Sequence, residues 1–279
     1  MKYNFGISIL SVASMAKLDS QQADILQSFL QVIKILTAAA HSLNLKAIEL
    51  SSVSPFDSPV LVMAKDKIRT LVDNLLCTFH LPLGDFNIGA LNQGIREVSM
   101  EEMKQLIEFS KSIGISTIVS HPGHFQSDSR MYKMFEPLAK KYVYEGILNL
   151  NEFSKERGVT LAVENLNIEE PFFHTPVEFE PLCENGVNLT LDTAHAIIAG
   201  VNPTDFLQKF PNQIAEIHLV DGKKGKLDLH YALGDGELDV KSFFQALKNT
   251  NFNGPIILEM ATIDDVKKSL LVLKNLKLI

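Results

Sequence analysis

Several features that identify common protein classes are scarce or missing in this sequence. Its 279 residues include two cysteines, Cys77 and Cys183, and no tryptophan. Two cysteines imply no disulfide framework, so a reducing, cytoplasmic location is expected. There is no run of about 18 apolar residues, which argues against a membrane span. Asn4 and Gly6 interrupt the apolar start of the chain early, which favours a first strand over a signal peptide.

Basic residues are outnumbered. Lys and Arg total 26 against 33 Asp and Glu, a formal net charge of −7. This balance argues against a protein that holds nucleic acid mainly through a basic surface, although it leaves room for a local basic groove. Neither a G-x-S-x-G segment nor a Cys–His nucleophile pattern is visible, which argues against nucleophilic acyl transfer.

Short β-like runs alternate with longer helix-like stretches along the whole chain. Several runs are almost entirely apolar, as expected of strands that are buried on both faces. Eight repeats of about 35 residues predict one α/β domain over residues 1–279, a (β/α)8 TIM barrel. A doubly wound sheet is the alternative, but it usually has a glycine-rich phosphate loop after its first strand, where this chain reads SVASMAKL. The predicted strands are Tyr3–Leu10, Lys46–Ser51, Cys77–Leu81, Thr117–His121, Thr160–Leu166, Asn188–His195, Ala215–Asp221 and Pro255–Met260.

Five stretches, four between these strands and one after the last, have a helical pattern of apolar residues. The segment Ser99-Met-Glu-Glu102 has the form of a capping box and is expected to start the second of them. The predicted helices are Gln21–Ser42, Ser99–Ile113, Met131–Arg157, Val240–Lys248 and Asp264–Leu276.

Side chains that bind metals follow most of the predicted strands. In a (β/α)8 barrel the catalytic groups come from the carboxyl ends of the strands. A lone histidine or acid there is commonly a hydrogen-bonded loop residue or a helix cap. Nine at one rim are costly to pack unless a cation compensates their charge, so we predict a centre for Zn, Mn, Mg, Co or Fe. The nine are His80, His121, Glu164, Asp192, His195, His218, Asp228, His230 and Glu259.

These residues and their neighbours resemble the xylose isomerase-like TIM-barrel superfamily, which contains sugar and sugar-phosphate isomerases and epimerases and endonuclease IV. The matching segments occur in the family's order from the third strand to the eighth. They are specific for the superfamily and much less specific for a reaction. They read FHLP (79–82), SHPG (120–123), AVENL (162–166), LDTAHA (191–196), IHLVDG (217–222), DLHYALGDGELD (228–239) and ILEM (257–260).

The resemblance implies one metal site and permits up to three. The core metal would be held by Glu164, Asp192, His218 and Glu259. In endonuclease IV two further metals are bound. By resemblance one would use His80 and His121 with Glu164 bridging, and the other His195, Asp228 and His230.

Two activities are compatible with this resemblance. The first is isomerisation or epimerisation of a sugar or sugar phosphate through a metal-stabilised enediolate, with Glu164 and Glu259 as the acid/base pair. Substrate contacts would come from His80, His121, His195, His124 and Lys223.

The alternative is hydrolysis of abasic DNA by a trinuclear zinc site, as in an AP endonuclease. The loops after the second and third strands contain one arginine and few aromatic residues, which favours the first activity. A third hypothesis is a barrel that binds a metabolite or metal without turnover. The resemblance permits both a monomer and a homodimer.

Overall fold

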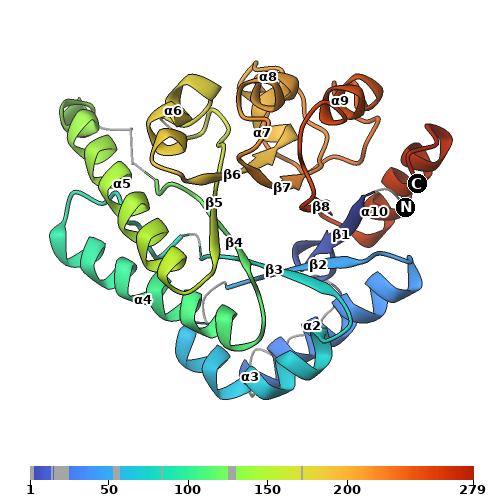
Figure 1. Ribbon diagram of the computed structural model, residues 1–279, viewed down its shortest axis with the longest axis horizontal. Coiled ribbons are helices and arrows are strands. Elements are labelled where there is room, and N and C mark those ends of the chain that lie inside the picture. The colour runs from blue at the N-terminus through green and yellow to red at the C-terminus, as the bar shows by residue number, and fades with distance from the viewer. Residues whose placement is uncertain are drawn as a thin grey trace.

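The computed structural model is a closed barrel of eight parallel strands surrounded by helices (Figure 1). It describes residues 3–13, 15, 25–52, 57–82, 84–124, 130–170 and 172–279. Each strand pairs with the next along the chain, and β1 pairs with β8 to close the barrel. The predicted (β/α)8 barrel is therefore confirmed, and the doubly wound sheet is excluded. The strands are β1 (Asn4–Ser8), β2 (Ala47–Ser51), β3 (Leu76–His80), β4 (Thr117–Ser120), β5 (Thr160–Glu164), β6 (Asn188–Asp192), β7 (Ile214–His218) and β8 (Pro255–Leu258).

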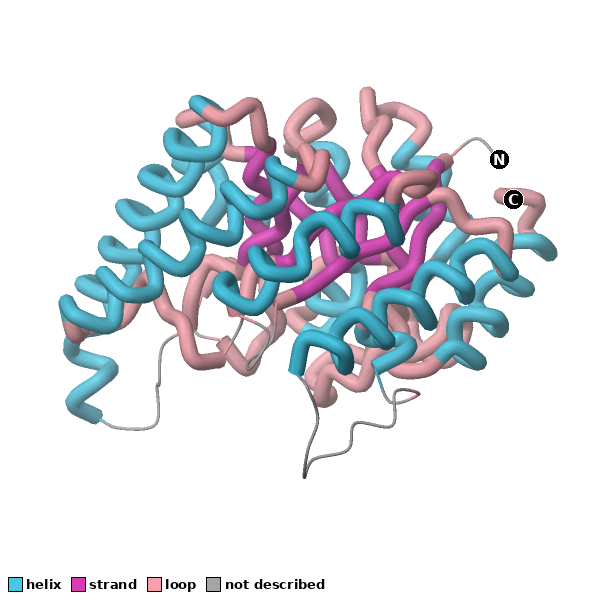
Figure 2. The backbone as a smooth tube through the Cα atoms, turned by 90° about the horizontal axis from the view of Figure 1, so that it is seen from below, coloured by secondary structure: helices cyan, strands magenta, loops and turns pink. Residues whose placement is uncertain are grey.

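The helices form an outer layer around the strands (Figure 2). All five predicted helices are present, as α2, α4, α5, α9 and α10, although residues 21–24 of the first prediction lie outside the described residues. The helices are α1 (Leu10–Ala13), α2 (Ile25–Ser42), α3 (Ser58–Val72), α4 (Gln93–Ser112), α5 (Arg130–Glu156), α6 (Pro176–Glu184), α7 (Thr193–Ile198), α8 (Pro203–Lys209), α9 (Val240–Leu247) and α10 (Ile263–Asn275).

Helix α4 begins six residues before its predicted start, so the capping-box prediction is wrong. The side chain of Asn92 caps the helix by accepting a hydrogen bond from the backbone N–H of Ile95, at 3.3 Å. Ser99 lies inside the helix, where its hydroxyl accepts a hydrogen bond from the backbone N–H of Asn87 at 2.7 Å. The serine that matched the capping pattern therefore ties down the loop between β3 and α4 instead.

Strand β6 is also shorter than predicted, because a helix begins within the expected strand. The strand ends at Asp192, whose carboxylate accepts a hydrogen bond from the backbone N–H of His195 at 2.7 Å and caps α7. His195 is consequently on the first turn of α7 rather than on a strand. Strands β4, β5 and β7 likewise stop at Ser120, Glu164 and His218, before their predicted ends.

The two faces of the barrel wall have different side chains. Large outward residues such as Phe5 and Phe79 belong to the main hydrophobic core between strands and helices. The inward position of Gly6 is crowded, since a Cβ atom there would lie 2.7 Å from side-chain atoms of both Ala47 and Ile257. Glycine lets the wall close at this level, and space for functional groups lies nearer the carboxyl ends of the strands.

The loop between β7 and α9 is folded around one buried carboxylate. The side chain of Asp221 accepts hydrogen bonds from three backbone N–H groups of this loop, at 2.8–2.9 Å. The loop carries Asp228 and His230 to the mouth of the barrel, so Asp221 fixes the path of a segment with predicted metal ligands. The donors belong to Gly222, Gly234 and Leu238.

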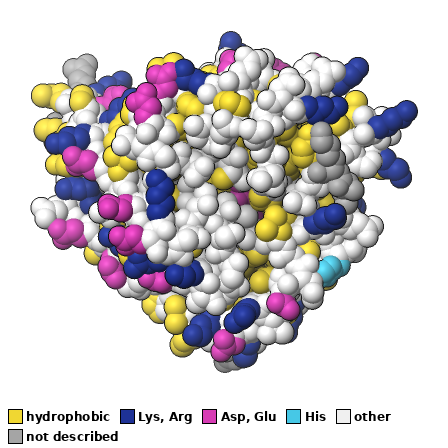
Figure 3. All heavy atoms as spheres, in the orientation of Figure 1, with side chains coloured by type: hydrophobic (Ala, Val, Ile, Leu, Met, Phe, Trp, Pro, Cys, Tyr) yellow, Lys and Arg dark blue, Asp and Glu magenta, His cyan; other side chains and the backbone are white. Residues whose placement is uncertain are grey.

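The outer surface has charges of both signs. On the face shown in Figure 3, Lys, Arg, Asp and Glu side chains are scattered around the edge, and the centre of the face is mostly uncharged. Within the described residues, none of the helices combines the length and apolar character that crossing a bilayer requires.

Candidate metal centre

The nine predicted ligands meet at the carboxyl-terminal mouth of the barrel. The mouth contains a cavity of about 460 Å³. Asp192 and His218 are buried next to the residues that line it, at 1% and 0% exposure. The structure therefore brings together all the residues that the sequence placed at separate strand ends. Those that line the cavity directly are His80, His121, Glu164, His195, Asp228, His230 and Glu259.

The four residues of the predicted core site form one tight group. One donor atom from each of Glu164, Asp192, His218 and Glu259 lies within 4.8 Å of the others. Nδ1 of His218 is 3.0 Å from Oε2 of Glu259, 3.4 Å from Oε1 of Glu164 and 4.0 Å from Oδ2 of Asp192. The group forms because β5, β6 and β7 end side by side and Glu259 follows β8 directly.

The electrostatic environment keeps two carboxylates of this group ionised at neutral pH. Burial raises the pKa of Glu164, but the imidazoles of His218 and His121 outweigh it and hold this pKa well below its usual range. Burial also opposes ionisation of Glu259, and His218 again lowers its pKa. The pKa of Asp192 is raised to about 7, mainly by burial and also by the charges of Glu164 and Asp228.

Two further groups of ligands adjoin this core. Nε2 of His80 and Nε2 of His121 lie 3.2 and 3.3 Å from the same oxygen of Glu164. On the other side, Nε2 of His195 lies 2.8 Å from Oδ2 of Asp228. The third member of that predicted set, His230, has its Nε2 4.0 Å from the same Asp228 oxygen. The donor atoms of His80, His121 and Glu164 all lie within 4.8 Å of one another, whereas in the second set only His195 and Asp228 are in direct contact.

Hydrogen bonds fix which nitrogen three of these histidines present to the cavity. Nδ1 of His80 donates to the carbonyl of Leu81 and Nδ1 of His195 to that of Asn165, each at 2.8 Å. Nδ1 of His230 donates to the carbonyl of Glu259 at 2.9 Å. Because a carbonyl oxygen can only accept, Nδ1 carries the proton in each ring, and Nε2 is the nitrogen available to a metal.

His218 has the opposite arrangement. Its Nε2 lies 3.2 Å from a carboxylate oxygen of Glu49, and its Nδ1 faces the core group. Within the described part of the chain this buried Nδ1 makes no hydrogen bond. Its nearest polar neighbours are carboxylate oxygens of Glu259 and Glu164, and a ring nitrogen buried against carboxylates is unfavourable unless a proton or a cation lies between them. One imidazole nitrogen and three carboxylates together form a donor set that suits a divalent cation.

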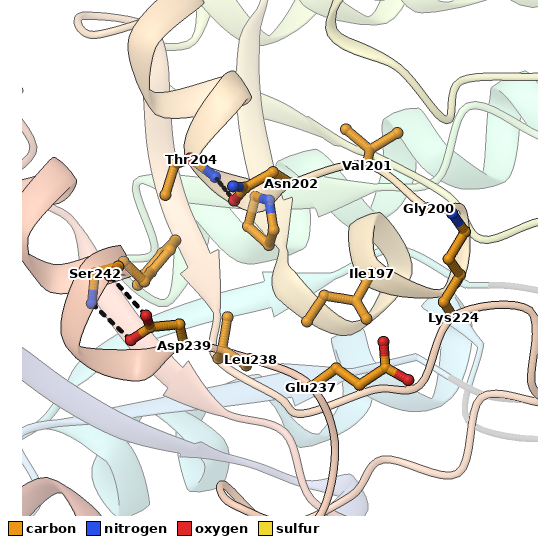
Figure 4. Close-up of a pocket in the computed structure, with 12 residues that line it drawn as sticks. Ile197, Gly200, Val201, Asn202, Thr204, Lys224, Glu237, Leu238, Asp239 and Ser242 are labelled. Carbon is orange, nitrogen blue, oxygen red and sulfur yellow. Dashed lines mark hydrogen bonds between the residues drawn. The ribbon is translucent and has the colours of Figure 1, made fainter.

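Two predicted substrate contacts lie outside the central cavity. His124 lines an adjoining cavity of about 280 Å³, which shares His121 with the central one. Nζ of Lys223 lies 4.8 Å from the centre of the Tyr231 ring, and Lys223 is not among the described residues that line the central cavity. Its neighbour Lys224 lines a third cavity, of about 390 Å³, near Gly200 and Glu237 (Figure 4).

Two buried carboxylates next to the core group were not predicted from the sequence. Glu49 on β2 is 1% exposed and Glu216 on β7 is fully buried. One donor atom from each lies within 4.8 Å of the other and of a nitrogen of His218. The sequence does contain a signal for both: each is a charged residue in the middle of an apolar strand, Glu49 in AIELS and Glu216 in IAEIH. Such a residue is costly to bury without a specific partner.

Comparisons with known proteins agree with this architecture. The family described as Xylose isomerase-like TIM barrel matches residues 37–276. An uncharacterized protein of Methanocaldococcus jannaschii, MJ1614, is 30% identical over 213 residues, which cover 73% of this chain and 77% of that protein. An inosose dehydratase of Clostridium perfringens is 25% identical over 182 residues, 54% of this chain and 60% of that enzyme.

Solved structures resemble the chain over almost its whole length. The crystal structure of a D-tagatose 3-epimerase-like protein has a TM-score of 0.78 and 21% sequence identity, and covers 98% of this chain and 97% of that one. A 3-keto-D-glucoside 4-epimerase from E. coli has a TM-score of 0.73 and 17% identity, with both chains fully covered. At these identities the likeness shows a shared fold.

Proposed function

Given that the chain belongs to the Xylose isomerase-like TIM barrel family, we propose that it is a divalent-metal-dependent isomerase or epimerase of a sugar. The observation that supports this most is the core group, in which three carboxylates surround a buried ring nitrogen that makes no hydrogen bond. Support also comes from three similar proteins, which are named as a D-tagatose 3-epimerase-like protein, a 3-keto-D-glucoside 4-epimerase and an inosose dehydratase.

The proposed metal ligands are Glu164, Asp192, His218 and Glu259. A divalent cation held there would polarise a substrate carbonyl and stabilise the negative charge that develops on its oxygen. His80, His121 and His195 line the same cavity and would orient hydroxyl groups of the substrate.

Glu164 and Glu259 are the proposed acid/base pair. Both have pKa values below the usual range and are therefore ionised at neutral pH, the form that accepts a proton. One carboxylate would take the proton from the carbon next to the carbonyl, and the electron pair of that C–H bond would move toward the carbonyl oxygen. The other carboxylate, after taking a proton from solvent, would deliver that proton to the opposite face, which inverts the carbon. Transfer to the former carbonyl carbon would instead give an isomer.

The lining of the cavity favours an uncharged sugar over a sugar phosphate. The wall includes the carboxylates of Glu169, Asp228 and Glu259, and its described residues include no lysine or arginine. Lys223, one of the predicted substrate contacts, lies over the ring of Tyr231 instead. A phosphate dianion would meet several negative charges in this wall, whereas a neutral polyol would find hydrogen-bond acceptors.

Solvent deuterium exchange tests the proposed reaction directly. Metal-loaded protein is incubated in D₂O with a panel of unphosphorylated ketoses and cyclic ketones. Deuterium at the carbon next to the carbonyl, together with an isomer or epimer, is the expected result. Glu259→Gln should lose both signals. Deuteration followed by loss of water would indicate a dehydratase, and no exchange with any member of the panel would contradict the proposal.

Cleavage of abasic DNA is a second candidate, because residues of the two additional ligand sets lie beside the core group. His80 and His121 share an oxygen of Glu164, and the pair of His195 and Asp228 is in direct contact. These sets would allow three metals. Elemental analysis together with nicking of an abasic oligonucleotide tests this candidate. Three zinc ions per chain with cleavage would favour it, and one metal with sugar exchange would favour the first proposal.

A further inference from the structure

A carboxylate outside the proposed ligand set contacts the imidazole of His218. Oε2 of Glu49 lies 3.2 Å from Nε2 of the ring. Both side chains are buried, at 1% and 0% exposure. Because a carboxylate oxygen accepts a hydrogen bond, this contact places a proton on Nε2 and leaves Nδ1 as the nitrogen that a cation in the core group would bind. Nδ1 is the nitrogen that faces the three carboxylates of the core group.

His218 differs from three other histidines of the cavity in the acceptor that its ring contacts. His80, His195 and His230 each donate Nδ1–H to a main-chain carbonyl. His218 lies in the last position of β7, as His80 does in β3, but its Nε2 faces a carboxylate on β2 instead of a main-chain carbonyl. The acceptor for its ring comes from inside the barrel.

We propose that Glu49 is the positioning residue of the metal centre, which it serves by holding His218 in the orientation and tautomer that present Nδ1 to the cation. The inference rests on the proposed function, since it requires a cation at His218. A carboxylate behind a metal-bound imidazole also increases the basicity of the ring. Loss of such a partner typically weakens metal binding by about 10- to 100-fold.

The chain contains a matched carboxylate for comparison. Glu216 is fully buried, two residues before His218 on the same strand. Its nearer oxygen is 3.9 Å from Nε2 of His218, too far for a hydrogen bond, and accepts one from the hydroxyl of Thr78 at 2.9 Å. Glu216→Gln therefore changes a buried carboxyl group near the ring without removing the partner of the ring.

Calorimetric titration of metal-stripped protein with Mn²⁺ provides the first test. Glu49→Ala should bind the ion about 10- to 100-fold more weakly than the unmodified protein. Glu49→Gln, whose amide oxygen still accepts from Nε2–H, should recover much of this loss, and Glu216→Gln should show much the smaller effect. If Glu49→Ala does not fold, Glu49→Asp, whose shorter side chain withdraws the oxygen from the ring, replaces it with the same expectation.

Nitrogen-15 spectra of the zinc-loaded protein provide a second readout that a merely structural role would not change. The unmodified protein and Glu216→Gln should show His218 with a proton on Nε2 that exchanges slowly with solvent, and Glu49→Ala should lose this slow exchange. Equal metal affinities for Glu49→Ala and Glu216→Gln would overturn the inference and leave the metal centre standing. Failure of the unmodified protein to bind any divalent cation would overturn the metal centre as well.

Discussion

Replacing Asp192 by asparagine should stabilise the metal-free protein while impairing the metal-bound one. Burial and the charges of Glu164 and Asp228 raise the pKa of this carboxyl from 3.8 to about 7. The unfolded chain therefore ionises Asp192 more easily than the folded chain does. The folded state loses stability as the pH rises from 3.8 toward 7, and the loss is complete above that range.

The size of this effect follows from the pKa. A rise from 3.8 to about 7 corresponds to about 4 kcal/mol of free energy for the ionised form. An asparagine amide carries no charge, and its oxygen can still accept the hydrogen bond from the backbone N–H of His195 that caps α7. In the presence of EDTA near pH 8, Asp192→Asn should therefore raise the free energy of unfolding by about 1 to 4 kcal/mol.

When metal is bound, the unmodified protein should instead be more stable than the Asp192→Asn variant. At a free concentration 100 times its dissociation constant, a cation that binds only the folded state adds about 2.7 kcal/mol. The unmodified protein should gain this amount from Mn²⁺, and the variant, which lacks one of the four proposed ligands, should gain much less.

Denaturant unfolding followed by circular dichroism, with EDTA and with excess Mn²⁺, measures both effects. Asp239→Asn is the control, because Asp239 also caps a helix but its pKa is lowered, by hydrogen bonds from Ser242. It should give no stabilisation in either condition. An Asp192→Asn protein that is less stable than the unmodified one in EDTA near pH 8 would refute the electrostatic reasoning.

Three further predictions concern the loop after β7, the barrel wall and the substrate. Asp221→Ala leaves three loop N–H groups without their acceptor and should lower the free energy of unfolding by about 3 kcal/mol, measured by denaturant unfolding. An unchanged midpoint would contradict this role. Gly254→Ala would place a Cβ atom 1.9 Å from the carbonyl oxygen of Ala215 and should destabilise by about 1 to 3 kcal/mol. The control Gly94→Ala, in a helix with its nearest contact at 3.3 Å, should be neutral or stabilising in the same measurement. A ketose should be turned over at least about tenfold more efficiently than its phosphate, a difference of about 1.4 kcal/mol in transition-state binding. Higher kcat/KM for the phosphate would show that the acidic wall does not exclude it.

The strands and the mouth of the barrel were predictable because both depend on local sequence. Buried parallel strands require apolar runs, and eight such runs separated by helix-length stretches fit one closed topology. Residues such as Glu164 and Glu259 stand directly after these runs, where any parallel barrel brings them to the same rim. Their convergence therefore followed from the order of the elements before any distance was known.

Element boundaries at the rim were less predictable. In the sequence the residues after Asp192 read as a continuation of the strand. In the structure the carboxylate of Asp192 caps a new helix, and His195 lies on that helix. Ser99 matched a capping pattern and instead binds the backbone of Asn87. In both cases a side-chain hydrogen bond decided between two conformations that local preference does not separate.

The sequence by itself determined the closed barrel and the nine acids and imidazoles at one end of it, because strand periodicity and strand-end position are properties of the chain alone. Only the tertiary structure decided which nitrogen of each ring faces the cavity, that Glu49 reaches His218 from another strand, and that Lys223 lies over Tyr231. Those outcomes depend on how strands far apart in the sequence are placed around the barrel. A contact of about 3 Å is set by that placement and not by neighbours along the chain.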